Sequence, residues 1–225
     1  MAAGLLDDLV SKLPQRPGRR SIALGVVLLV FGAVVLGWLG WQFVGSSLVA
    51  RYQYAAQLDQ LRTQWERGEP PAVSSPPASG QAYAILRVPK FGDRFEVPIV
   101  AGVDQRDLAK GVGAYPSSVA PGQVGNFALA GYRITHGGPF GKLLRLEPSD
   151  EVVIETRDKV YTYVIDVGAA EVTVKDDAAW VLDPVPGRPG AEATQPTLTM
   201  TTSEDLLGSP DRSVAFGHLG STRNK

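Results

Sequence analysis

Cysteine is absent from the 225-residue chain, and histidine occurs only twice, at His136 and His218. The absence of cysteine excludes disulfides, cysteine-ligated zinc, iron–sulfur clusters and every mechanism with a cysteine nucleophile. Neither histidine has other metal-binding side chains at ligand spacing around it. We therefore expect no metal site and no cofactor.

An excess of charge of either sign is also absent. Lys and Arg total 22 and Asp and Glu total 23, which gives a net charge of −1. A balanced charge offers no broad basic surface to a phosphate backbone, so we expect no nucleic-acid partner. Hydrophobic residues make up 44% of the chain and charged residues 20%, which is typical of a globular protein.

A long run from Ile22 to Trp41 carries no charged side chain. Twenty helical residues span about 30 Å, the thickness of the hydrocarbon core of a bilayer. The sequence therefore predicts a single transmembrane helix over 22–44. A cleavable signal peptide, with Leu48 to Ala50 as a weak cleavage site, is the alternative, but its apolar region is usually only about 7–15 residues long.

Basic residues before this run predict its orientation. By the positive-inside rule, residues 1–21 form a cytoplasmic tail, and the chain after the helix lies outside the plasma membrane. The basic residues that carry this prediction are Lys12, Arg16, Arg19 and Arg20.

An amphipathic helix, a linker and a domain follow in order. Apolar residues at helical spacing predict a stalk helix over 45–67. Residues 68–80 are rich in Pro and Ser and predict an extended linker. The remainder predicts a folded domain over 81–220 and a short tail over 221–225. The apolar positions of the stalk helix are Leu48, Tyr52, Ala55, Leu58, Leu61 and Trp65.

The outer domain has the pattern of short β-strands. Residues 151–156 and 160–165 flank a short polar stretch and predict a hairpin. Pro98 indicates that the strand over 95–100 is an edge strand or contains a bulge. About eight strands with turns between them predict a small antiparallel or mixed barrel with short helices. The other expected strands are 83–88, 126–130, 172–174, 197–202 and 213–218, and the helical pieces are 107–110 and 140–144.

Several ordered segments of the domain resemble sortases. Residues 125–133, Gly-Asn-Phe-Ala-Leu-Ala-Gly-Tyr-Arg, are similar to the family motif G-N-x-x-(I/L)-A-G-H-R. Residues 197–203 resemble the strand end T-L-x-T-C, and residues 211–216 resemble the closing strand that begins near an arginine. Residues 180–187 are similar to class E sortases of actinobacteria. The resemblance implies a mainly-β, closed sortase-like barrel, here preceded by the single transmembrane helix.

The resemblance also implies three site positions. Sortases attack the Thr–Gly carbonyl of a sorting signal with a thiolate, use a histidine as general acid and base, and stabilise the substrate and oxyanion with an arginine. Mapped onto this chain, those positions hold Ser203, Tyr132 and Arg212. A serine hydroxyl needs a base to accept its proton. A phenol with an ordinary pKa near 10 is a poor base at pH 7.

Each of these residues also has an alternative interpretation. His136 follows Tyr132 in a Gly-rich loop and could replace the missing base, or be a solvated loop residue. Ser203 could cap a short helical turn over 204–207. Arg212 could pair with a nearby carboxylate or bind a peptide. His218 is interpreted as structural.

Three functions follow. The first is a catalytically inactive, membrane-anchored, sortase-like module that binds a sorting-signal-like peptide or a cell-envelope protein through Tyr132, Ser203 and Arg212. The second is an active class E-type transpeptidase or peptidase that acts on LPxTG- or LAxTG-like signals with Ser203 as nucleophile. The third is a structural subunit of a membrane complex. Loss of both the thiol and the histidine favours the first and third.

Overall fold

A computed structural model of the chain describes residues 19–41, 46–68, 77–203 and 210–225. The chain divides into two compact units, residues 1–42 and 43–225. In the first unit, helix α2 (Arg19–Gly40) presents exposed apolar side chains. None of the described helices combines the length and hydrophobicity that a membrane crossing requires. The transmembrane helix over 22–44, of which 42–44 lie outside the described residues, is thus not confirmed.

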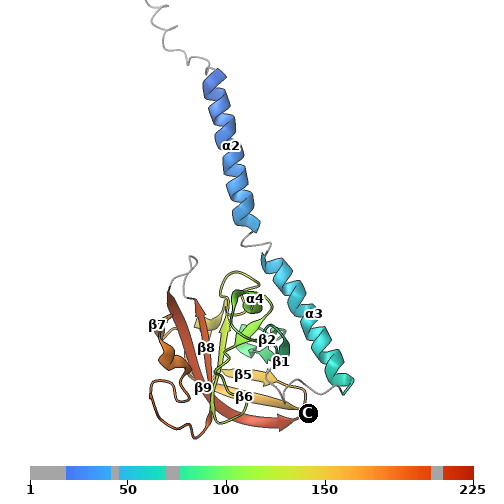
Figure 1. The fold of residues 1–225 in the computed structure, drawn as a ribbon, viewed down its shortest axis with the longest axis vertical. Coiled ribbons are helices and arrows are strands. Elements are labelled where there is room, and N and C mark those ends of the chain that lie inside the picture. The colour runs from blue at the N-terminus through green and yellow to red at the C-terminus, as the bar shows by residue number, and fades with distance from the viewer. Residues whose placement is uncertain (1–18, 42–45, 69–76, 204–209) are drawn as a thin grey trace, which may run out of the picture. The chain divides into compact units, whose positions relative to one another are not determined.

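The second unit is built on one nine-stranded sheet within the described ranges, in the order β6-β5-β1-β2-β3-β4-β8-β9-β7. Strands β6 and β9 also pair along their length, which closes the sheet into a barrel and leaves β7 paired to β9 alone (Figure 1). The mainly-β closed barrel is therefore confirmed. The strands are β1 (Ala82–Arg87), β2 (Glu96–Ala101), β3 (Val112–Ala114), β4 (Gly125–Gly131), β5 (Glu151–Glu155), β6 (Lys159–Val167), β7 (Thr173–Lys175), β8 (Pro196–Ser203) and β9 (Asp211–Asn224).

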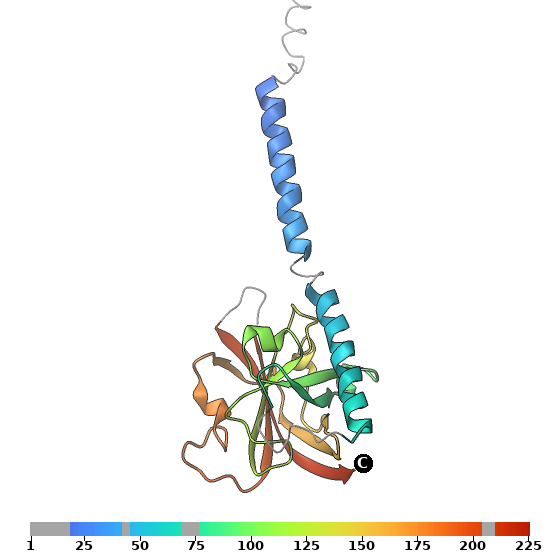
Figure 2. The ribbon, with the colours of Figure 1, turned by 45° about the vertical axis from the view of Figure 1, so that its right-hand side comes forward.

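Helices in this unit are few. Helix α3 (Ser46–Glu66) runs along the barrel beside β1 and β2, as Figure 2 shows. The short helix α4 (Gln105–Leu108) lies between β2 and β3. The 3-10 helices are η3 (Pro89–Phe91), η4 (Leu143–Arg145) and η5 (Ala179–Leu182).

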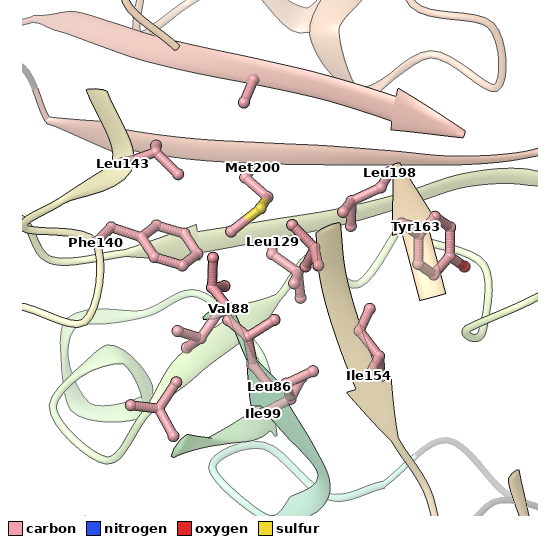
Figure 3. Close-up of a cluster of buried hydrophobic side chains, with 14 of the residues drawn as sticks. Leu86, Val88, Ile99, Leu129, Phe140, Leu143, Ile154, Tyr163, Leu198 and Met200 are labelled. Atoms are coloured by element: carbon pink, nitrogen blue, oxygen red, sulfur yellow. The ribbon is translucent and has the colours of Figure 1, made fainter. Parts of the chain in front are cut away.

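The core fills the barrel with side chains from most of its strands. Alternate residues of a strand point to opposite faces, so Leu198 and Met200 of β8 point inward with Leu129 of β4. Figure 3 shows these side chains gathered with those of β1, β2 and β5. Phe140 and Leu143, from the segment after β4, are also fully buried in this core. The site strands β4 and β8 thus stand on a rigid, close-packed base.

Pro98 does not mark an edge strand. It lies in β2, which pairs with β1 on one side and β3 on the other. The ladder with β3 begins at Ile99, one residue after the proline. The missing N–H of Pro98 therefore removes no hydrogen bond from that ladder, and the expectation of an edge is wrong.

Residues 221–224 are also not a separate tail. Strand β9 continues to Asn224, which pairs with Lys159 of β6. The Nζ atom of Lys225 then lies 2.6 Å from Oε1 of Glu155 and 4.6 Å from the ring centroid of Trp65 on α3. The C-terminal residues therefore close the barrel and contact α3.

Helix α3 buries a different stripe from the one expected. Leu48 and Tyr52 are 64% and 80% exposed. Ala50 and Tyr54 are buried in their place, at 2% and 5% exposure. Further along, Leu58 and Leu61 pack on Ile85 as expected. The predicted stripe was set by hydrophobicity alone, whereas small Ala50 and amphipathic Tyr54 fit the barrel surface more closely. Packed in this way, α3 is part of the domain's unit and not a free stalk.

Candidate functional site

Three neighbouring strands bring the expected site positions to one end of the barrel. Strands β4 and β8 are parallel, and Gly131 pairs with Thr202, so both strands end at the same edge. Tyr132 directly follows β4, and Ser203 is the last residue of β8. Strand β9 runs antiparallel to β8 and places Arg212 opposite Ser203. Backbone register therefore gathers Tyr132, Ser203 and Arg212 at this edge.

Two threonines of β8 add side-chain hydrogen bonds to this register. The hydroxyl of Thr202 donates a 2.7 Å hydrogen bond to the carbonyl of Gly131. The hydroxyl of Thr201 donates to the carbonyl of Leu129 at 3.3 Å. Both threonines are buried, at 3% exposure or less. These side-chain bonds add to the ladder between β4 and β8 at the point where the site begins.

A buried amide of β4 holds the η5 segment against the sheet. Asn126 of β4 is 3% exposed and donates from Nδ2 to the carbonyls of Val181 at 2.9 Å and Asp183 at 3.1 Å. Its Oδ1 accepts a 2.8 Å hydrogen bond from the hydroxyl of Thr199. Trp180 stacks on Phe216 of β9 at 6.0 Å between ring centroids. The η5 segment is thus held against β4, β8 and β9.

The loop after β4 is closed at its base. Phe140 donates its N–H to the carbonyl of Tyr132 at 3.0 Å. A Cβ on Gly131 would lie 2.8 Å from the Phe140 ring, so only glycine permits this close approach. Because Phe140 is fully buried in the core, the loop between the two residues starts and ends at fixed points.

His136 lies against Tyr132 within this loop. Their rings stack with centroids 4.5 Å apart and an interplanar angle of 22°. Partial burial raises the pKa of the Tyr132 phenol above 10.0 and lowers that of His136 below 6.5. Burial disfavours the charged form of each group. Near neutral pH the site therefore holds a protonated phenol beside a neutral imidazole, which can accept a proton.

The structure describes Arg212 and leaves the alternatives for Ser203 open. Arg212 donates from Nη1 to the carbonyl of Asp211 at 3.0 Å, while the carboxylate of Asp211 pairs with Lys175. The expected helical turn over 204–207, with its acids Glu204 and Asp205, lies outside the described residues, and so does the side chain of Ser203. The cap interpretation of Ser203 and its contact with His136 therefore stay predictions.

His218 does not belong to the site. It pairs with Thr197, near the start of β8, whereas Ser203 ends that strand. Its Nδ1 lies 2.7 Å from Oδ1 of Asp166, with both side chains largely exposed. Among the residues that the structure describes, no group of His, Asp and Glu could hold a metal ion.

The sequence analysis missed one residue that contacts the loop of the candidate site. Tyr54 of α3 donates its hydroxyl to the carbonyl of His136 at 2.7 Å. Its pKa is raised by burial, and secondarily by Tyr132. The signal for it was the pair Ala50 and Tyr54 at i, i+4 spacing, which places both on one helical face.

Comparison with known proteins agrees with this architecture. The family model "Sortase domain" matches residues 86–220. The chain is 31% identical over 215 residues to Sortase SrtE1 of Streptomyces coelicolor, which covers 91% of this chain and 59% of that protein. It is 36% identical over 107 residues to Sortase D of Bacillus subtilis, covering 48% and 50% of the two chains. The matched regions thus span 59% and 50% of the lengths of these two relatives.

Solved structures extend the likeness to the fold. Sortase E of Streptomyces avermitilis is 35% identical with a TM-score of 0.59, covering 65% of this chain and 93% of that one. Sortase E1 of Streptomyces coelicolor, solved with a tripeptide in its active site, is 32% identical with a TM-score of 0.56, covering 66% and 93%. The strand order, the converging strand ends and a family match over more than half of its residues together show that this chain belongs to the sortase family.

Proposed function

We propose that the chain is a sortase-fold module that binds a sorting-signal-like peptide or a cell-envelope protein at the strand-end site, with little or no transpeptidation. One observation carries the proposal. The family's histidine position holds Tyr132, and burial raises the pKa of its phenol further above 10.0. That side chain keeps its proton at neutral pH and cannot serve as a general base.

The residue at the family's cysteine position also disfavours catalysis. Ser203 stands where sortases have their cysteine, and a hydroxyl, unlike a thiol, reaches its nucleophilic anion near pH 7 only with a positioned base. Loss of general base catalysis alone typically costs a factor of about 10² to 10⁴ in rate. With both changes in one site, binding is the property that the remaining residues support best.

Arg212 supports peptide binding. It is partly exposed at the start of β9, opposite Ser203 in register. A guanidinium can hold a peptide carbonyl or carboxylate with charge-assisted hydrogen bonds. The related sortase E1 of Streptomyces coelicolor has been solved with a tripeptide in its active site. By analogy, we infer that the strand-end site of this chain binds a peptide.

Titration with a labelled Leu-Ala-x-Thr-Gly-type peptide tests the proposal. We expect saturable binding that Arg212→Ala weakens by about 10-fold or more, because bonds to charged groups are stronger than neutral ones. Arg145→Ala, which removes an exposed arginine of η4, is the matched control and should leave the affinity unchanged. Absence of saturable binding, or equal effects of the two variants, contradicts the proposal.

A second candidate is a serine-dependent transpeptidase or peptidase. The stack of His136 on Tyr132 favours it, because it places an imidazole beside the family's histidine position. The lowered pKa of His136 keeps that imidazole neutral and able to accept the Ser203 proton. Under this candidate, product formed from the peptide and a Gly-bearing acceptor would disappear in both Ser203→Ala and His136→Asn.

We further propose that residues 22–44 anchor the chain in the plasma membrane, with the folded unit outside. The proposal rests on the uncharged sequence from Ile22 to Trp41 and the basic residues before it. Alkaline extraction of membranes from expressing cells tests it. The full chain should stay in the membrane pellet and residues 46–225 should be released; extraction of both contradicts the anchor.

A further inference from the structure

Helix α3 contacts the loop of the candidate site directly. Tyr54 is 5% exposed, and its hydroxyl donates a 2.7 Å hydrogen bond to the carbonyl of His136. At the next residue, a Cβ on Gly137 would lie 3.2 Å from Cε2 of Tyr54 and 3.7 Å from Cβ of Ala50. The helix therefore packs against the middle of the loop with both a polar and a steric contact.

The loop conformation at this contact is an unusual one. His136 has φ 51°, in the left-handed region that residues other than glycine rarely adopt, and Gly137 follows with φ 79°. Such backbone conformations cost free energy and persist where surrounding contacts hold them. The hydrogen bond from Tyr54 holds the carbonyl of the peptide between His136 and Gly137, the two residues with positive φ.

His136, whose carbonyl Tyr54 binds, also contacts a residue of the candidate site. The His136 ring stacks on Tyr132 at 4.5 Å between centroids. The base of the loop is fixed by the bond from the Phe140 N–H to the carbonyl of Tyr132. Within the loop, Nδ1 of His136 also lies 3.1 Å from Oγ1 of Thr135, and the Gly138 N–H donates to the carbonyl of Thr135. Tyr54 adds a contact from outside the loop, on the carbonyl of His136 itself.

We propose that Tyr54 is a positioning residue of the candidate site: from α3 it holds the loop after β4 in the conformation that stacks His136 on Tyr132. The helix that precedes the barrel thereby sets the geometry of the site. This inference concerns the arrangement of the site and holds whether the site binds a peptide or reacts with it.

Amide hydrogen exchange in full-length Tyr54→Phe tests the restraint on the loop. The change removes one hydroxyl and keeps the ring that packs on the barrel. The amide of Gly138, which donates to the carbonyl of Thr135, and that of Phe140 should exchange about fivefold faster, as expected for loss of one hydrogen bond. The amide of Ile165, bonded to the carbonyl of Asp150, reports global stability and should not change. Tyr52→Phe, on the 80% exposed side of the same helix, is the control.

Histidine NMR signals report the geometry of the stack. The chain has two histidines, so the ring signals of His136 are assigned by comparison with His218→Gln. In Tyr54→Phe the shift that the Tyr132 ring current imposes on His136 should diminish. Neighbours of the ring include Tyr132, which stacks on it, and Thr135, whose Oγ1 lies 3.1 Å from Nδ1. As the ring moves away from Tyr132 and becomes more hydrated, the pKa of His136 should rise towards 6.5. His218 should be unaffected.

Two results would overturn the inference. One is unchanged exchange at Gly138 and Phe140 together with unchanged His136 signals. The other is an equal acceleration at Ile165, which would mean that Tyr54 contributes only to overall stability. Peptide affinity rests on the proposed function and is measured separately: absence of saturable binding to the wild type would contradict the proposed function, while the exchange and NMR results on Tyr54→Phe would still decide the positioning role.

Discussion

Tyr132 and His136 shield each other's rings partly from water, and this burial moves their pKa values in opposite directions. The phenol is held protonated and the imidazole is held neutral, because burial disfavours charge on either group. At neutral pH the stack is therefore uncharged. Arg212 contributes positive charge at this edge of the barrel, which suits a site that holds a peptide carbonyl or carboxylate.

The lowered pKa of His136 predicts a pH-dependent stability. Above about pH 6.5 both the folded and unfolded states hold a neutral imidazole, and the contribution is fully present. As the pH falls through 6.5 towards the lower folded pKa, the unfolded state takes up the proton first, so stability decreases. Urea unfolding at about pH 7.5 and about pH 5.5 should show a larger loss for the wild type than for His136→Asn.

The contribution of Glu96 to stability changes in a lower pH range than that of His136. Glu96 is desolvated, which raises its pKa, but hydrogen bonds from Arg62 and Arg87 lower it overall, below 4.5. Its contribution is present above about pH 4.5 and is lost only below that value. An equal stability loss in wild type and His136→Asn between the two pH values would mean that the imidazole is not shielded in the folded state.

At the scale of elements, α3 is fastened to the barrel along most of its length. Tyr54 contacts the site loop, Leu61 packs on Ile85, and Trp65 meets Lys225. Arg62 also pairs with Glu96 of β2 at 2.5 Å. A helix docked at all these points is a structural part of the domain, and its N-terminal half contacts the loop of the candidate site through Tyr54.

Truncation of the buried face of α3 should cost far more than truncation of its exposed face. Leu61 is 3% exposed, so Leu61→Ala leaves a cavity against Ile85 and should lower the free energy of unfolding by about 2–4 kcal/mol. Leu48→Ala, at 64% exposure on the same helix, should change it by less than about 0.5 kcal/mol. Denaturant unfolding measures both, and similar values would show that α3 is not docked as described.

Sequence patterns predicted the strands well where alternation was clear and poorly where it was not. The hairpin of β5 and β6 followed from alternating apolar residues around a polar turn. Strand β3 was missed because it has only three residues, Val-Gly-Ala, and no alternation. The predicted buried face of α3 was wrong at its N-terminal end because Leu48 with Tyr52 and Ala50 with Tyr54 both have helical spacing, and the barrel surface decides which pair is buried.

The sequence predicted which positions could form the candidate site but not how they lie relative to one another. Motif resemblance identified Tyr132, Ser203 and Arg212, and strand register then brought them to one edge. The parallel pairing of β4 with β8 joins segments far apart in the chain, which local patterns do not determine. Tyr54 was missed for the same reason, since its bond to the carbonyl of His136 spans 82 positions.

At the scale of the whole molecule, the second unit combines barrel, α3 and C-terminal strand. Strand β9 pairs with β6, β7 and β8, and Lys225 then bridges Glu155 and Trp65. Contacts between distant parts of the chain therefore close the structure at several points. Such a unit is expected to unfold in one cooperative transition.

A fragment of residues 46–225 tests this cooperativity. Loss of helical signal in far-ultraviolet circular dichroism, to which α3 contributes, should coincide with loss of aromatic signal in the near ultraviolet. Two separate transitions, with the helical signal lost first, would show that α3 unfolds independently of the barrel and would contradict its role in the site.

The most direct test of the central claim is intact-mass spectrometry of the chain after incubation with an excess of Leu-Ala-x-Thr-Gly-type peptide. Because the proposed binding module keeps the proton on Tyr132, whose pKa is raised, we predict that the mass of the protein stays unchanged. An added mass equal to the acyl part of the peptide, absent in Ser203→Ala, would contradict the account.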